Sequence, residues 1–164
     1  MPILTRRHFL QGTGTTALSL GLAQQAMPQD PLWQPNSDIR VACVGIRGRG
    51  GNHISGFNRM KGVRVVALVD VDSSVLAREK KKLADGKYGE KTEVDIYTDL
   101  RRVLDRDDID AISVATPNHW HALQAIWACQ AGKDVYLEKP VSHNVWEGVQ
   151  IVKAARKYKR IVQT

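Results

Sequence analysis

The stretch IRVACVGIRGRG, residues 39–50, decides the fold of this chain. Its first half is a short apolar run, as in a buried strand, and its second half carries glycine at positions 45, 48 and 50. A glycine-rich turn between a strand and a helix is typical of nucleotide-binding α/β folds, because the turn is tight and the backbone must approach a phosphate. The stretch therefore predicts a strand, a phosphate-binding turn and a helix that begins near Arg49.

Strand and helix patterns alternate along the rest of the sequence. Apolar runs predict strands at 63–69, 95–97, 111–115, 135–138 and from 161 onward; the helices expected between them are 49–60, 72–87, 100–104, 119–131 and one ending near 158. Asp72, Asp99 and either Ser142 or Asn144 are suited to cap three of the helices. Nearly continuous apolar strands separated by helices indicate a parallel sheet covered on both faces. The predicted fold class is α/β, a Rossmann-type doubly wound parallel sheet.

Composition supports an ordinary globular domain. The chain has 164 residues, of which 43% are hydrophobic and 25% are charged, and its net charge is +7. The basic stretches 78–82 and 156–160 have helical spacing, so we interpret them as solvated helix faces and expect no nucleic-acid partner. Cys43 and Cys129 stand alone inside apolar elements, which predicts no metal site and no redox motif.

The N-terminus carries the pattern of a bacterial export signal. The stretch TRRHFLQ, residues 5–11, contains the twin arginines Arg6 and Arg7, and a weakly apolar segment rich in Gly and Thr follows. That segment is too short for the ~20 residues of a membrane span. We therefore expect residues 1–26 to direct export to the periplasm by the twin-arginine route, 27–38 to be a linker and 39–164 to be the nucleotide-binding domain.

An acidic residue closes the second predicted strand and suggests which nucleotide binds. The usual G-x-G-x-x-G spacing would place glycine at 45, 47 and 50, but Arg47 stands in the middle with Gly48 beside it. Asp70 follows 25 residues after Gly45 (70 minus 45). A carboxylate there can accept hydrogen bonds from both ribose hydroxyls and repels a 2′-phosphate. The pattern predicts NAD in preference to NADP.

Two further strand ends carry polar residues. Thr116, Pro117 and Asn118 follow the fourth predicted strand, while Glu138 and Lys139 end the fifth and precede a proline. Because the carboxyl ends of parallel strands meet at one edge, and open α/β sheets bind ligands there, we expect these turns to share a site.

Together these motifs resemble the Gfo/Idh/MocA oxidoreductase family. The resemblance rests on GIRGRG with His53, on Asp70, on ATPNHWH at 115–121 and on EKP at 138–140, and it runs from about Ile39 to the end. It implies that Asp70 holds the adenosine ribose and that Lys139 lies beside the nicotinamide as the catalytic group, often before a cis proline. The candidate cofactor-binding residues are Gly45, Arg47, Gly48, Arg49, Gly50, Asp70, Thr116, Pro117, Asn118, His121, Glu138 and Lys139. His53 is interpreted as structural.

The resemblance also implies a function that needs more than this chain. Family members carry a C-terminal α/β domain that supplies the substrate pocket, and this sequence lacks it, so we expect a C-terminally truncated domain that alone is inactive and that self-associates. The leading hypothesis is hydride transfer between NAD(H) and a sugar-like or polyol hydroxyl. Two alternatives stay open: the N-terminal half of an NAD-dependent glycosidase, and a non-catalytic nucleotide-binding fragment.

Overall fold

The structure is a computed structural model that describes residues 38–164. The export signal expected at residues 1–26 and the linker up to residue 37 lie outside the described residues.

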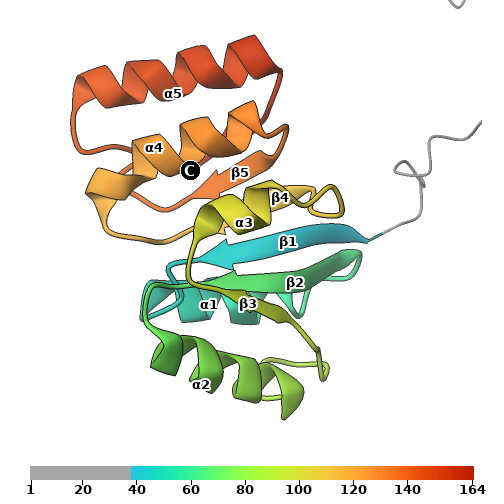
Figure 1. Cartoon of the computed structure of the whole chain (residues 1–164). Helices are drawn as coiled ribbons and strands as arrows, with labels where there is room; N and C mark the ends of the chain where they lie inside the picture. The colour runs from blue at the N-terminus through green and yellow to red at the C-terminus, as the bar shows by residue number, and fades with distance from the viewer. Residues whose placement is uncertain (1–37) are drawn as a thin grey trace, which may run out of the picture. The chain divides into compact units, whose positions relative to one another are not determined.

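Strands and helices alternate as the sequence predicts (Figure 1). The elements are β1 (Ile39–Val44), α1 (Arg49–Phe57), β2 (Val63–Val69), α2 (Ser73–Ala84), β3 (Asp95–Tyr97), α3 (Leu100–Leu104), β4 (Ala111–Val114), α4 (Asn118–Gln130), β5 (Asp134–Leu137), α5 (Val145–Tyr158) and β6 (Val162–Gln163). Their bounds differ from the predicted ones by up to three residues. The second helix stops earlier than expected because Gly86 follows with a φ of 75°, a conformation that leaves the helix.

The six strands form one parallel sheet in the order β3-β2-β1-β4-β5-β6. The chain runs outward from β1 in one direction through β2 and β3, then returns to the other side of β1 with β4. The strand order reverses between β1 and β4, and ligands bind outside the carboxyl ends at such a point. The predicted Rossmann-type fold is confirmed.

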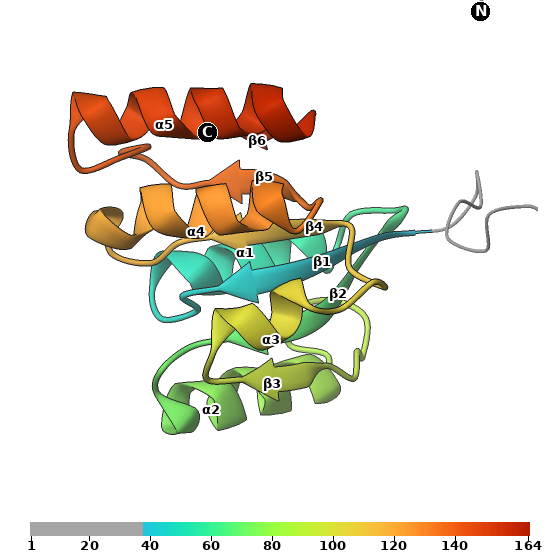
Figure 2. The same ribbon diagram turned by 45° about the horizontal axis from the view of Figure 1, so that its top comes forward.

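Helices cover both faces of the sheet (Figure 2). Each face has its own apolar core. The core on one side joins β1 and β2 to α1 and α2 through residues such as Cys43, Ile54 and Leu76. The core on the other side joins the strands to α3, α4 and α5, and includes Ile112 and Ala125. Burial on both faces explains why the strands are nearly continuous in apolar residues.

Side-chain caps begin three of the helices. The carboxylate of Asp72 accepts hydrogen bonds from backbone N–H groups at the start of α2, and Asp99 does the same for α3. Asn144 caps α5 by accepting from the N–H of Glu147, which decides between the two candidates for that helix. Each cap stabilises its helix by ~1 kcal/mol.

Both cysteines are buried and free. Burial raises the pKa of the Cys43 thiol to about 12, and burial likewise raises the pKa of Cys129. A thiol that stays protonated is a poor nucleophile, so both act as small apolar residues.

The last helix presents an apolar face to solvent. Val145, Val149 and Val152 lie on one face, and 85%, 45% and 48% of their surfaces are exposed. Ile151 and Ala154 instead bury the helix against the core. The three valines thus form an exposed apolar stripe that runs beside the buried face of the helix.

Candidate functional site

The carboxyl ends of the five strands β1 to β5 lie side by side at one edge of the sheet. Backbone hydrogen bonds of 2.8–3.1 Å extend past the strands at this edge; their donors are Gly45, Asp70, Ala115 and Glu138, and their acceptors are Val69, Tyr97, Val44 and Val114. These bonds bring together turns that are far apart in sequence. The structure places these turns next to one another at the carboxyl edge of the sheet.

The glycine turn after β1 leaves no room for side chains at two positions. A Cβ on Gly50 would lie 2.0 Å from the carbonyl oxygen of Gly45, and a Cβ on Gly45 would lie 2.7 Å from the backbone nitrogen of Thr116. Gly45 and Gly48 also have φ values of 74° and 61°, which only glycine adopts readily. The turn therefore packs backbone on backbone just before α1 begins at Arg49, which suits close approach of a phosphate to a helix N-terminus.

Arg47, which interrupts the usual glycine spacing, points away from this packed backbone. Its side chain is 72% exposed and its guanidinium donates to the carboxylate of Asp72 at 2.9 Å. The hydrogen bonds from Ser74 and then the charge of Arg47 hold the pKa of Asp72 below its usual range. The ion pair links the turn after β1 to the turn after β2.

Asp70 is half-buried between the same two turns. Its Oδ2 accepts a hydrogen bond of 3.0 Å from the backbone N–H of Ile46, and its Oδ1 accepts one of 3.0 Å from the N–H of Asp72. Each carboxylate oxygen retains a second lone pair for a ligand hydroxyl. The carboxylate therefore holds the loop in place and remains able to accept from a ribose.

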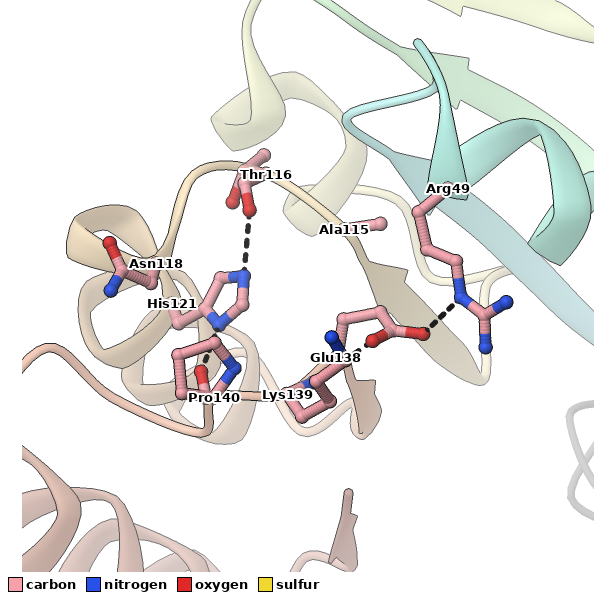
Figure 3. Close-up of a pocket in the computed structure, with 8 residues that line it drawn as sticks. All are labelled: Arg49, Ala115, Thr116, Asn118, His121, Glu138, Lys139 and Pro140. Carbon is pink, nitrogen blue, oxygen red and sulfur yellow. Dashed lines mark hydrogen bonds and ion pairs between the residues drawn. The ribbon is translucent and has the colours of Figure 1, made fainter.

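A pocket of about 420 Å³ opens between the turns after β4 and β5 (Figure 3). Six of the predicted site residues line it, together with two that were not predicted, Ala115 and Pro140; the six are Arg49, Thr116, Asn118, His121, Glu138 and Lys139. The other predicted residues, Gly45, Arg47, Gly48, Gly50, Asp70 and Pro117, do not line this pocket. The sequence-predicted site thus divides into a glycine turn with Asp70 and a separate pocket around Lys139.

Glu138 is the centre of a hydrogen-bonded network in this pocket. Its Oε1 accepts from the Nε of Arg49 at 2.6 Å and lies 3.1 Å from the Nε2 of His53, while its Oε2 accepts from the backbone N–H of Lys139 at 3.0 Å. The hydrogen bond from Arg49 and that from His53 lower the pKa of Glu138 to about 2. The network joins the start of α1 to the residue that precedes Lys139.

The ring of His53 is fixed from its other side. Its Nδ1 lies 2.7 Å from the Oγ of Ser113, and both residues are buried. These contacts hold the His53 ring between Glu138 and Ser113, a residue that the sequence patterns did not single out. A polar residue within the apolar strand 111–114, opposite a helix histidine, was the available signal.

Lys139 itself is exposed, and its backbone N–H is the point at which it joins the network around Glu138. The peptide bond between Lys139 and Pro140 is cis, as the resemblance implies. Among residues 38–164 no hydrogen bond or ion pair engages its Nζ. Its ammonium group is therefore available to a ligand in the pocket.

The described part of the chain offers neither a metal site nor a membrane-spanning helix. Residues 38–164 contain no group of three or more His, Cys, Asp or Glu side chains arranged to hold a metal ion. Within the same range, no helix is both long and apolar enough to cross a membrane.

Comparison with known proteins identifies relatives of the whole domain. Residues 39–164 match the model of an oxidoreductase family with an NAD-binding Rossmann fold. A glycosyl hydrolase family 109 protein from Shewanella pealeana is 31% identical over 94% of this chain and 37% of its own length. An alpha-N-acetylgalactosaminidase from Shewanella oneidensis is 30% identical over 93% of this chain and 37% of its own length.

Solved structures share the fold. Myo-inositol 2-dehydrogenase from Lactobacillus plantarum superimposes with a TM-score of 0.63 at 28% identity, over 77% of this chain and 36% of that one. Scyllo-inositol dehydrogenase from Lactobacillus casei, with NAD(H) and scyllo-inositol bound, gives a TM-score of 0.67 at 23% identity, over 77% of this chain and 36% of that one. The chain thus spans a little over a third of the proteins it matches.

The family match covers the strands, helices and turns that build the glycine turn and the Lys139 pocket. This chain belongs to the Gfo/Idh/MocA oxidoreductase family and carries its NAD-binding Rossmann domain.

Proposed function

We propose that this domain binds NAD(H) along the carboxyl edge of its sheet and positions it for hydride transfer at a hydroxyl-bearing carbon of a sugar or polyol. The observation that carries the proposal is the packed glycine turn, where a Cβ at Gly50 would meet the carbonyl oxygen of Gly45. Such a backbone surface before a helix suits a pyrophosphate. The family match to an NAD-binding fold supports the same cofactor.

Three groups of residues have different roles in this proposal. Gly45, Gly48 and Gly50 let the backbone approach the phosphates, and Asp70 accepts hydrogen bonds from the adenosine ribose. Arg49 lies at the start of α1 with its Nε on Glu138, so its two Nη groups can donate to a phosphate. The bound dinucleotide supplies the hydride acceptor or donor.

Lys139 carries the proposed proton chemistry. As an ammonium, Lys139 stabilises negative charge on the substrate oxygen and can give it a proton when the carbon is reduced. As a neutral amine, it can take the hydroxyl proton when the carbon is oxidised. The backbone N–H of Lys139 donates to the Oε2 of Glu138 at 3.0 Å, and this hydrogen bond fixes the backbone position from which the lysine side chain extends. The substrate must also be held close to the nicotinamide, and we expect a second domain in a longer protein to do this.

Calorimetric titration of the chain with NAD, NADH, NADP and NADPH tests the cofactor proposal. We expect saturable binding of NAD or NADH that Gly50→Ala abolishes. Absence of binding to all four would contradict the proposal.

A second candidate function is an NAD-dependent glycosidase, which the names of the Shewanella relatives favour. Such an enzyme oxidises a sugar hydroxyl, eliminates the aglycone, adds water to the resulting double bond and returns the hydride, so the cofactor is unchanged at the end. A longer protein that contains this domain distinguishes the two when it is assayed with sugars, polyols and aryl glycosides. Steady accumulation of NADH indicates a dehydrogenase, whereas aglycone release without net NADH indicates a glycosidase. Lys139→Ala should lower either rate by about 10²–10⁴-fold.

We propose, in addition, that the chain is exported through the twin-arginine route. Arg6 and Arg7, followed by Phe9 and Leu10, support this proposal at the sequence level.

A further inference from the structure

One buried histidine ties together the two turns that form the pocket. Only 1% of the surface of His121 is exposed. Its Nδ1 lies 2.8 Å from the carbonyl oxygen of Pro140, and its Nε2 lies 2.8 Å from the carbonyl oxygen of Thr116. Figure 3 shows the ring between these two residues, which come from the turns after β5 and β4. The Pro140 contact lies one residue after Lys139.

The chemistry of these partners makes the two contacts depend on a proton. A carbonyl oxygen only accepts hydrogen bonds, and a neutral imidazole has a single N–H group. Both contacts are therefore complete only when each ring nitrogen of His121 carries a proton. Without the second proton, a nitrogen lone pair faces a carbonyl oxygen in a buried place, which is unfavourable.

No other group near the ring, among the described residues, replaces the two carbonyl oxygens as a partner of its nitrogens. The charged groups on the pocket wall are Arg49, Glu138 and Lys139, and the other histidine on α4, His119, is exposed. The Glu138 carboxylate is already occupied by Arg49, by His53 and by the N–H of Lys139. The two ring nitrogens of His121 have hydrogen-bond partners only in the two backbone carbonyls, within residues 38–164.

We propose that His121 is a proton-dependent clamp of the cofactor pocket. With both nitrogens protonated, it joins the Thr116 turn to the Lys139–Pro140 turn; loss of one proton releases one of them. His121 is thus a positioning residue, and its effect on cofactor binding rests on the function proposed above. Because a pocket with pre-positioned walls loses less entropy on binding, NAD binds more tightly when the clamp is closed.

The first test is nuclear magnetic resonance of the full chain, and it does not require the cofactor. We expect ¹⁵N spectra at the acidic end of a pH titration to show protons on both ring nitrogens of His121, and the alkaline end to show one. The amide signals of Val141 and Asn118, which adjoin the two turns, should shift with the same midpoint. A ring with one protonated nitrogen throughout the range where the protein is folded would overturn the proposal.

The second test measures NAD affinity over the same pH range. We expect the dissociation constant to rise about tenfold through the midpoint of His121, a change equivalent to one net hydrogen bond. His121→Gln places an amide NH₂ group and no titratable proton at this position, so NAD should bind this variant with a dissociation constant that does not depend on pH in this range. His119→Gln, an exposed neighbour on the same helix, is the matched control and should keep the wild-type profile.

The outcomes separate this proposal from the proposed function. A His121→Gln variant that keeps the wild-type pH profile overturns the clamp, and loss of the profile in His53→Gln instead would assign it to the other buried histidine. If NAD does not bind at any pH, the proposed function fails, and the ring spectra alone decide whether the clamp exists.

Discussion

The backbone N–H of Ile46 donates a hydrogen bond of 3.0 Å to the Oδ2 of Asp70. The acid that closes the second strand therefore also holds the turn that follows the first strand. Its second oxygen accepts from the N–H of Asp72, so the carboxylate joins the two turns. Substitution of Asp70 is expected to change both the shape of the site and its charge.

We expect the chain to bind NAD more tightly than NADP, because the Asp70 carboxylate repels a 2′-phosphate. Asp70→Asn keeps an oxygen acceptor but removes the charge, so it should reduce the discrimination while keeping most of the NAD affinity. Asp70→Ala also removes the two loop hydrogen bonds and should raise the dissociation constant of NAD by roughly tenfold or more. Calorimetric titration with both cofactors measures this, and equal affinity of the unaltered chain for NAD and NADP would refute the role of Asp70.

Gly50→Ala should destabilise the domain and abolish cofactor binding. The new Cβ would lie 2.0 Å from the carbonyl oxygen of Gly45, so the backbone has to move. We expect the free energy of unfolding to fall by roughly 3 kcal/mol. Urea denaturation followed by circular dichroism measures the change.

Gly56→Ala is the matched control on the same helix. A Cβ at Gly56 meets no atom within 4 Å. Alanine should therefore raise the free energy of unfolding by ~0.5–1 kcal/mol, because glycine weakens a helix interior. A loss at Gly56 as large as that at Gly50 would show that α1 tolerates no substitution and that close packing is not the cause.

Because of Glu138, the free energy of unfolding is expected to vary with pH in the acidic range. Its pKa is lowered from 4.5 to about 2, first by the hydrogen bond from Arg49. A carboxyl group with a lowered pKa in the folded state binds more protons when unfolded, so its contribution is complete above about pH 4.5 and is lost as pH falls toward 2.

Glu138→Gln should therefore be less stable than the unaltered chain at neutral pH, by roughly 1–3 kcal/mol. The difference in the free energy of unfolding between Glu138→Gln and the unaltered chain should become smaller as pH falls. Urea unfolding at a series of pH values measures it, and Glu90→Gln is the control, because the exposed Glu90 carboxylate has no hydrogen bond in the described structure. A difference that stays constant down to pH 2 would argue against the assigned ion pair.

Export is expected to depend on the two N-terminal arginines. A fusion of residues 1–38 to a reporter that must fold in the cytoplasm should reach the periplasm through the twin-arginine route. Replacing both Arg6 and Arg7 with lysine should stop export of the fusion, because the twin-arginine route recognises the arginine pair. Export that survives the double substitution would point to another route.

The order of strands and helices could be predicted from the sequence because its signals are local. A cap such as Asp72 acts on N–H groups within three residues, and the glycine at 45 is required by the φ of its own turn. Apolar runs likewise report burial of the strand that contains them. The same reasoning brought Asp70 and Lys139 to one edge of the sheet, since parallel strands end together.

Only the tertiary structure decided which of these residues touch. Glu138 pairs with Arg49, 89 residues away, and with His53, 85 residues away, because β1 and β5 both flank β4 and bring α1 against the end of β5. The contacts of His121 with Thr116 and Pro140 depend on the same neighbouring strands. Sequence periodicity states that a residue is buried, whereas its partner depends on strand order, and strand order follows from how all the apolar faces pack at once.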